Sequence, residues 1–216
     1  MKKYKLIIFD LDGTIADTSP GILNSVRYTQ QKLDLPEISL EAMYRHVGPP
    51  MEESYYNNFR LEGEMLYSAV KFHKEYAMNQ GYLELELYPE MDSTLNKLKQ
   101  KGYLIAIATL KADATAKKIF DNLKLSDKFD IIVGTNQTTL TSKEQVILKC
   151  ISELKEAKED VLLVGDSHYD AIGAEKVGVD FLGVLYGFGF QAQEEVAKYQ
   201  NIGSIKKVSD IWYFLE

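Results

Sequence analysis

The chain has 216 residues, which is enough for one large domain or two modest ones. Hydrophobic residues make up 45% of the sequence and charged residues 26%, as is typical of a globular protein, and the formal net charge is −7. This charge argues against binding of a nucleic-acid polymer or an anionic membrane surface. A site for small anions would need a metal cation or locally concentrated positive side chains.

The single cysteine, Cys150, cannot form an internal disulfide, which fits a reducing compartment. The apolar run near the N-terminus meets Asp10 too early for a signal peptide, and no apolar stretch is long enough to span a membrane. We therefore expect a cytoplasmic protein with no membrane partner, present as a monomer or a weak homo-oligomer.

Short apolar runs along the chain predict buried β-strands. The runs are continuously apolar rather than alternating, which indicates a sheet covered on both faces. Amphipathic helical stretches lie between them, and this alternation predicts an α/β fold with a doubly wound, parallel, Rossmann-like sheet. The predicted strands span residues 4–9, 103–109, 129–134, 160–166 and 180–186, and the predicted helices 91–100, 112–123, 143–154 and 170–178.

The stretch between the first and second strands is different, because helix follows helix there with no convincing strand. Four helical segments are expected, at residues 21–33, 39–48, 48–59 and 62–81. We expect these helices to form an all-helical cap domain, residues 17–88, inserted into a core domain made of residues 1–16 and 89–216. At the far end, residues 211–215 are predicted as a helix that buries its aromatic side chains.

Polar side chains follow several of the predicted strands at the point where each strand ends. Because ligands in open α/β sheets bind beyond the carboxyl ends of the strands, these side chains are expected to converge on one site. The expected site residues are Asp10 and Asp12 after the first strand, Thr109 with Lys111 after the second, Asp166 and Asp170 after the fourth, and Lys143 at the start of a helix.

The carboxylates of this group fit metal-assisted phosphoryl chemistry. Asp10, Asp166 and Asp170 offer the hard oxygen ligands that Mg²⁺ prefers. Asp10 can attack phosphorus as a carboxylate nucleophile, and Asp12 can protonate the leaving oxygen. In an extended segment residues i and i+2 share a face, so both carboxylates can address one substrate.

Two further groups of the expected site suit the substrate's phosphate. Thr109 offers a hydroxyl donor and Lys143 an ammonium. Lysine at a helix start is disfavoured by the helix dipole, which points to an anion-related task. Each residue also has an ordinary reading: Asp10 with Asp12 as a capped strand end, Thr109 as a β-branched strand residue, and Lys143 as a surface lysine.

Four segments with these residues resemble the motifs of the haloacid dehalogenase superfamily. They are "DLDGT" at residues 10–14, "IATLK" at 107–111, "SKEQVI" at 142–147 and "GDSHYDAIGA" at 165–174. The resemblance spans essentially the whole chain. It implies Mg²⁺-dependent hydrolysis of small phosphomonoesters through an aspartyl-phosphate, with the main-chain carbonyl of Asp12 as a further metal ligand.

A narrower resemblance concerns the substrate. "HVGPPMEES" at residues 46–54 and "GVLYGFG" at 183–189 resemble a subgroup of phosphoglycolate phosphatases and 5′-nucleotidases with helical caps. Phosphoglycolate and nucleoside monophosphates are the two leading substrates, and the residues do not separate them. In the cap, Arg45 and Gly48 could contact the substrate or be ordinary structure. Two positions depart from the family pattern, namely Leu110 where serine is common and Glu90 where glycine is common.

Other functions were weighed against this one. A sugar-phosphate mutase of the same fold would carry a histidine at position 22, where this chain has Ile22. A dehalogenase would lack Asp12. A receiver-type domain that accepts phosphate on aspartate has no long helical insertion, and a silent binding protein would not need every reactive group. His168, although it lies between two of the acids, is expected to face away from the chemistry.

Overall fold

The computed structural model describes residues 4–136 and 142–215 of the chain. The chain divides into two compact units. The first, called here the sheet unit, comprises Met1–Asp17 and Leu87–Glu216, and the second, the helical unit, comprises Thr18–Glu86. Among the described residues, no helix is both long enough and apolar enough to cross a membrane.

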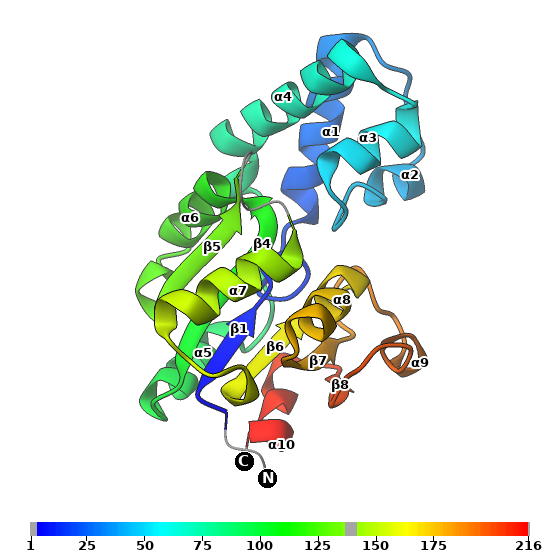
Figure 1. Cartoon of the computed structure of the whole chain (residues 1–216). Coiled ribbons are helices and arrows are strands. Elements are labelled where there is room, and N and C mark those ends of the chain that lie inside the picture. The colour runs from blue at the N-terminus through cyan, green and yellow to red at the C-terminus, as the bar shows by residue number, and fades with distance from the viewer. Residues whose placement is uncertain (1–3, 137–141, 216) are drawn as a thin grey trace. The chain divides into compact units, whose positions relative to one another are not determined.

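The sheet unit is built on six strands in the order β5-β4-β1-β6-β7-β8, and every neighbouring pair is parallel (Figure 1). In register, Phe9 of β1 lies between Ile107 of β4 and Val164 of β6. The central strand therefore delivers the residue after Phe9 to the same edge as the residues after its two neighbours. The strands are β1 (Leu6–Phe9), β4 (Leu104–Ala112), β5 (Ile131–Thr135), β6 (Val161–Gly165), β7 (Asp180–Val184) and β8 (Gly203–Ile205).

Helices cover the sheet on both faces, as the continuously apolar strands predict. Leu6 and Ile8 of β1 pack in one buried cluster with Val146 of α7 and Ala171 of α8, and Figure 1 shows these two helices in front of the strands. Because side chains alternate along a strand, Ile7 points to the opposite face, where it is also fully buried. The helices are α5 (Met91–Gln100), α6 (Asp113–Asn122), α7 (Lys143–Leu154), α8 (His168–Val177), α9 (Gln193–Val196) and α10 (Trp212–Leu215).

The predicted and observed elements of the sheet unit agree best where the apolar pattern is strong. The helices at residues 91–100 and 143–154 have the predicted bounds. Strand β4 continues to Ala112, beyond the predicted end at residue 109, with a register shift between Ala108 and Ala112. The edge strand β8 was not predicted, because its sequence Gly-Ser-Ile is short and only Ile205 is buried.

The predicted C-terminal helix is only partly correct. The segment is helical, as 3₁₀ helix η4 (Val208–Ile211) followed by α10, but none of the α10 residues is buried. Tyr213 is 80% exposed, whereas Ile211 just before the helix is 1% exposed. Ile211 is therefore the fully buried side chain of this pair, whereas Trp212 and Phe214 are only partly buried. The other 3₁₀ helices of the sheet unit are η2 (Ser126–Lys128) and η3 (Lys158–Asp160).

The helical unit has its own small core. Tyr55 and Leu61 pack there with Ala69 and Val70 of α4, and partly buried apolar residues surround them. Ser39 caps α2 by accepting a hydrogen bond from the Ala42 amide, although this helix is shorter than the predicted 39–48. The unit contains α1 (Ser19–Leu33), α2 (Leu40–Tyr44), α3 (Met51–Phe59), α4 (Gly63–Asn79) and η1 (Gly81–Leu83).

Two short strands lie where the chain passes between the units. Strand β2 (Ala16–Asp17) and strand β3 (Glu86–Leu87) form a separate two-stranded sheet. Neither was predicted, because two residues carry no readable periodicity. One unit boundary follows β2, between Asp17 and Thr18, and the other falls within β3, between Glu86 and Leu87.

Candidate active site

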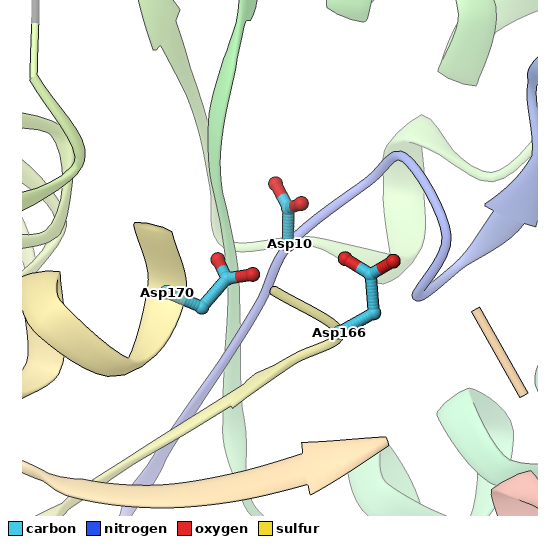
Figure 2. A group of neighbouring side chains, drawn as sticks. All are labelled: Asp10, Asp166 and Asp170. Atoms are coloured by element: carbon cyan, nitrogen blue, oxygen red, sulfur yellow. The ribbon is translucent and has the colours of Figure 1, made fainter. Parts of the chain in front are cut away.

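Three carboxylates from separate elements converge at the carboxyl edge of the sheet. Asp10 follows β1 and Asp166 follows β6, which are paired neighbours, and the Asp10 amide donates a hydrogen bond of 3.0 Å to the Val164 carbonyl. Asp170 lies one helical turn further on, in α8. One carboxylate oxygen from each of the three lies within 4.8 Å of the others, and all three residues are buried (Figure 2).

The loop after β1 turns sharply beside this cluster. The amides of Thr14, Ile15 and Ala16 all donate to the Leu11 carbonyl, which folds the backbone back on itself. Gly13 has φ +78°, and a Cβ atom there would lie 2.2 Å from Oδ2 of Asp166. Only glycine fits this position, because a side chain would have to displace a carboxylate of the cluster.

Lys143 is a buried cation between two of the carboxylates. Its ammonium lies 2.7 Å from Oδ1 of Asp10 and 2.6 Å from Oδ1 of Asp170, and only 5% of the side chain is exposed. A capping box at Ser142 fixes the start of α7 immediately before it. Burial by itself would lower the pKa of Lys143, but the charges of Asp10 and Asp170 outweigh burial and raise that pKa.

Asp166 is held by a glycine-rich loop whose place beside this residue could not be predicted from the sequence. Its Oδ2 atom accepts hydrogen bonds from the amides of Phe188, at 2.8 Å, and Gly189, at 3.0 Å. A Cβ atom on Gly187 would lie 2.3 Å from the Gly13 carbonyl oxygen, so two glycine-containing loops meet here. The two glycines after β7, Gly187 and Gly189, indicate a tight loop in the sequence, but they do not indicate that this loop contacts Asp166.

Asp170 has two tasks within the same cluster. Its Oδ2 atom accepts hydrogen bonds from the amide of Ser167, at 3.0 Å, and from the Ser167 hydroxyl, at 2.6 Å. These bonds belong to the capping box that begins α8. Since its other oxygen contacts Lys143, Asp170 couples the start of the helix to the ion-pair cluster.

Burial and mutual repulsion raise the pKa of two of these acids. Burial, followed by the charges of Asp170 and Asp12, raises the pKa of Asp10 to about 7, although Lys143 opposes the shift. Burial, then the charges of Asp170 and Asp10, raises the pKa of Asp166 to about 8, although two amide hydrogen bonds oppose it. The site is therefore hard to ionise fully without an additional cation.

Asp12 stands apart from that cluster and pairs with a different lysine. The Lys111 ammonium lies 3.2 Å from Oδ1 of Asp12, and the two side chains are 15% and 14% exposed. Thr109 is 1% exposed near the end of β4, and its Oγ1 atom accepts a hydrogen bond of 3.1 Å from the Lys111 amide. Sequence reasoning noted Lys111 at the strand end but assigned it no role.

The charges of the site fit a divalent metal ion. Four carboxylates, Asp10, Asp12, Asp166 and Asp170, carry four negative charges when ionised, and the two lysines carry two positive charges. The remainder, −2, equals the charge that a divalent cation would neutralise. Oxygen ligands alone, with carboxylates from three elements, are the donor set that Mg²⁺ prefers.

Three other residues named in the sequence analysis are not part of the cluster of Asp10, Asp166 and Asp170: His168 in the sheet unit, and Arg45 and Gly48 in the helical unit. His168 is exposed and its ring contacts that of Tyr169, with centroids 4.1 Å apart. In the helical unit, Arg45 is exposed and forms an ion pair of 2.8 Å with Glu41, and Gly48 has φ +102° with open space around it. Contact of Arg45 or Gly48 with a substrate stays a prediction.

A parallel α/β sheet that carries three buried carboxylates and a buried lysine at its carboxyl edge fits the class of phosphoryl-transfer enzymes. Residues 7–184 match the family described as haloacid dehalogenase-like hydrolase. The chain belongs to this family, and the predicted doubly wound α/β fold and superfamily resemblance are confirmed.

Individual relatives agree with this assignment. A 5′-nucleotidase from Pseudomonas aeruginosa is 29% identical over 92% of this chain and 89% of that protein. A phosphoglycolate phosphatase from Aquifex aeolicus is 32% identical over 85% of this chain and 86% of that protein. The solved structure of a haloacid dehalogenase-like hydrolase from Streptococcus pneumoniae has a TM-score of 0.92 and 29% identity, with each chain covered completely.

Other relatives of similar identity carry different names. One is named pyrophosphatase, and another is named tyrosine-protein kinase, of which this chain spans 63%. The predicted activity class, a phosphoric monoester hydrolase, is confirmed by family membership together with these phosphatase relatives. The substrate is not settled by similarity.

Proposed function

We propose that the chain is a Mg²⁺-dependent phosphatase that hydrolyses small phosphomonoesters through an aspartyl-phosphate on Asp10. The observation that carries this proposal is the environment of Asp10, which lies beside Asp166, Asp170 and Lys143 at one end of the sheet. Asp10, Asp166 and Asp170, with the Asp12 carbonyl, would hold the Mg²⁺. When bound, Mg²⁺ neutralises phosphate charge and polarises a phosphoryl oxygen.

Asp10 is the nucleophile. Lys143 engages its Oδ1 atom at 2.7 Å, which leaves Oδ2 for attack on phosphorus. Attack forms the Oδ2–P bond and breaks the bond between phosphorus and the leaving oxygen. Because Lys143 is held on two sides by Asp10 and Asp170, it fixes the orientation of the nucleophile as well as its charge.

Asp12 is the general acid and base. It lies two residues from Asp10 and outside the tight carboxylate cluster, so it can exchange a proton without disturbing the metal ligands. In the first step it protonates the leaving oxygen, and in the second it takes a proton from the water that attacks the aspartyl-phosphate. The products are the alcohol and inorganic phosphate, and Asp10 is regenerated.

Thr109 and Lys143 bind the phosphoryl oxygens. The Lys143 ammonium has three N–H donors, of which two face carboxylates and one remains for phosphate. The Thr109 hydroxyl accepts from the Lys111 amide and keeps its own proton for donation. Both residues lie at the same sheet edge as Asp10, on neighbouring elements.

Phosphoglycolate is the proposed substrate, and nucleoside 5′-monophosphates are the alternative. Each is supported by a relative named for that activity, with 32% and 29% identity respectively. We further propose that the predicted cap, residues 17–88, selects between them, because the sheet unit addresses only the shared phosphate. The lone cysteine supports a cytoplasmic location.

A hydrolysis screen of phosphorylated metabolites tests the proposal. The purified chain is incubated with phosphoglycolate, nucleoside monophosphates and sugar phosphates, in Mg²⁺ and in excess chelator, and phosphate release is measured. Many turnovers that require Mg²⁺ are expected. A single equivalent of phosphate held on the protein would instead indicate a receiver-like role, and Mg²⁺-independent turnover would contradict the metal assignment.

A further inference from the structure

We infer that Lys111 is a positioning residue, which holds the Asp12 carboxyl group in the orientation needed to protonate the leaving oxygen. The inference rests on the proposed function, in which Asp12 is the general acid. It assigns to Lys111 a task distinct from that of the buried Lys143.

The backbone around Lys111 is fixed by contacts on both sides. Strand β4 continues past Thr109 with a register shift, and Thr135 donates from Oγ1 to the Leu110 carbonyl at 2.8 Å. On the same segment, the Lys111 amide donates to Oγ1 of Thr109 at 3.1 Å. A Cβ atom on Gly134 would lie 2.6 Å from the Lys111 carbonyl oxygen, so the neighbouring strand β5 presses closely against this turn. Lys111 therefore projects from a rigid position.

Of the two carboxylates in the Asp-x-Asp pair, the Lys111 side chain forms its ion pair with Asp12. Its ammonium lies 3.2 Å from Oδ1 of Asp12, whereas Lys143 contacts Asp10. Each of the two carboxylates is thus held by a lysine of its own. Since like charges two residues apart repel, a separate cation for Asp12 keeps its carboxyl group away from the nucleophile.

The exposure of the pair indicates what it does. The side chains of Lys111 and Asp12 are 15% and 14% exposed, close to the 11% of Asp10, so the attraction between Lys111 and Asp12 is only partly screened by water. A proton on Oδ1 of Asp12 would face the Lys111 ammonium, so the proton that reaches the leaving group is assigned to Oδ2. The proton moves from Oδ2 to the leaving oxygen as the bond from that oxygen to phosphorus breaks, and Lys111 holds the carboxylate that remains.

This role makes a specific demand on the substrate. An alkyl phosphate needs protonation of its leaving oxygen, whereas p-nitrophenyl phosphate releases a stabilised anion and needs little. Loss of Lys111 should therefore harm the first reaction much more than the second. A lysine that merely attracted the anionic substrate would affect both esters alike, chiefly through KM.

The experiment compares Lys111→Met with wild type on two esters, p-nitrophenyl phosphate and the best alkyl ester of the hydrolysis screen. We expect kcat/KM for the alkyl ester to fall about 100-fold, as for loss of a well-placed general acid. We expect kcat/KM for p-nitrophenyl phosphate to fall by less than about threefold, because kcat/KM does not include the later attack of water, in which Asp12 acts as base for every ester. Lys111→Arg should recover most of the alkyl-ester activity, because a guanidinium can hold the same carboxylate.

Two controls separate positioning from folding. Lys117→Met removes a lysine of helix α6 whose ion pair with Asp113 is exposed, and should leave both activities unchanged. In an Asp12→Asn background, adding Lys111→Met should cost less than about threefold on the alkyl ester, because the group that Lys111 positions is already gone. Thermal unfolding shows whether each variant is folded.

Several results would show that Lys111 does not position Asp12. Equal losses of kcat/KM on both esters, or a full additional loss in the Asp12→Asn background, would overturn it. If Lys111→Met does not fold, the same comparison is made with Lys111→Arg and Lys111→Gln, of which only arginine should retain the alkyl-ester activity. If wild type hydrolyses neither ester, the proposed function itself fails, which is a separate result.

Discussion

The sheet unit buries charged side chains in contact with one another, whereas the helical unit buries a histidine among aromatic rings. In the sheet unit, the buried Lys143 ammonium lies within 2.7 Å of both Asp10 and Asp170, at the carboxyl edge of the sheet. In the helical unit, the buried His46 ring lies among aromatic rings, 4.9 Å from Tyr55. Among the described residues, neither ring nitrogen of His46 has a hydrogen-bond partner. The sheet unit thus concentrates buried charges where chemistry is expected. In the helical unit, where packing dominates, the buried His46 ring is neutral.

Because of this difference, we expect substitutions in the two units to change different measured properties. Substitutions in the acidic cluster should alter activity, metal affinity and the pH dependence of stability together, because one set of contacts serves all three. The rings of His46, Tyr55 and Phe59 form an aromatic cluster in the helical unit, and substitutions there should alter stability alone.

Asp10→Asn should abolish turnover, with kcat reduced at least about 1,000-fold, because the amide cannot form the aspartyl-phosphate. Its stability should be close to that of wild type or higher in chelator, because the substitution removes a repelling charge from a buried cluster. Steady-state kinetics and thermal unfolding measure the two effects. Asp160→Asn, in an exposed pair with Lys5, serves as the control and should retain full activity. Unimpaired turnover by Asp10→Asn would contradict the mechanism.

Lys143→Met should lose both activity and stability. Removing the ammonium leaves Asp10 and Asp170 buried without their cation, which costs about 3–5 kcal/mol of unfolding free energy. Chemical denaturation measures the loss. The matched control is Lys99→Met, whose pair with Asp130 is 34% and 24% exposed, so a loss below about 1 kcal/mol is expected there. Equal losses in the two variants would show that the buried cluster is not the special feature of this unit.

Mg²⁺ should stabilise the protein more strongly as pH rises from 6 to about 8. The pKa of Asp10 is raised to about 7 and that of Asp166 to about 8, above their ordinary values near 4. Between these limits the folded state binds more protons than the unfolded state, so the metal-free protein loses stability as pH rises. Bound Mg²⁺ favours the ionised carboxylates and offsets that loss, by about 2.7 kcal/mol at 100 times its dissociation constant.

Melting temperatures measured across this pH range, with Mg²⁺ and with chelator, check the prediction. Asp166→Asn should weaken both the metal effect and its pH dependence, since it removes one ligand and one titrating group. Glu153→Gln alters an exposed acid paired with Lys149 and should leave both unchanged. A Mg²⁺ effect that is independent of pH would contradict the assignment of these carboxylates as ligands.

The sequence was enough to predict the centre of the sheet and most of the residues at its edge. The apolar runs before Asp10 and Asp166 could be read because both faces of these strands are covered, so every residue is apolar. The spacing of Asp166 and Asp170 likewise reflects a local element, one turn of a capped helix. Such features depend on residues close in the chain, which is why the sequence alone reveals them.

Features that depend on distant contacts could not be predicted. The amides of Phe188 and Gly189 hold Asp166 across 22 and 23 positions of sequence, and nothing in "YGFGF" names that partner. The contact between Lys111 and Asp12 depends on the extension and register shift of β4, which follow from its pairing with β5. The short strand β8 is fixed by its neighbour β7 rather than by its own pattern.

The smallest expected effect lies in the helical unit and concerns His46. Burial lowers the pKa of His46 to about 4, below its ordinary value of 6.5. The neutral ring is therefore favoured in the folded state, and its contribution is fully present above pH 6.5 and is lost as pH falls toward 4. His46→Phe should make stability less dependent on pH in that range, by about 2 kcal/mol, with kcat nearly unchanged.

Denaturation at several pH values between 4 and 7, with activity measured at neutral pH, tests this last prediction. His168→Phe is the matched control, because that histidine is exposed and its substitution should leave the pH dependence as in wild type. If His46→Phe behaved like wild type in stability but lost activity, the contrast between the units would fail, since a side chain of the aromatic cluster would then serve the chemistry. If stability alone changes, the aromatic cluster is a packing element whose buried histidine needs only to stay neutral.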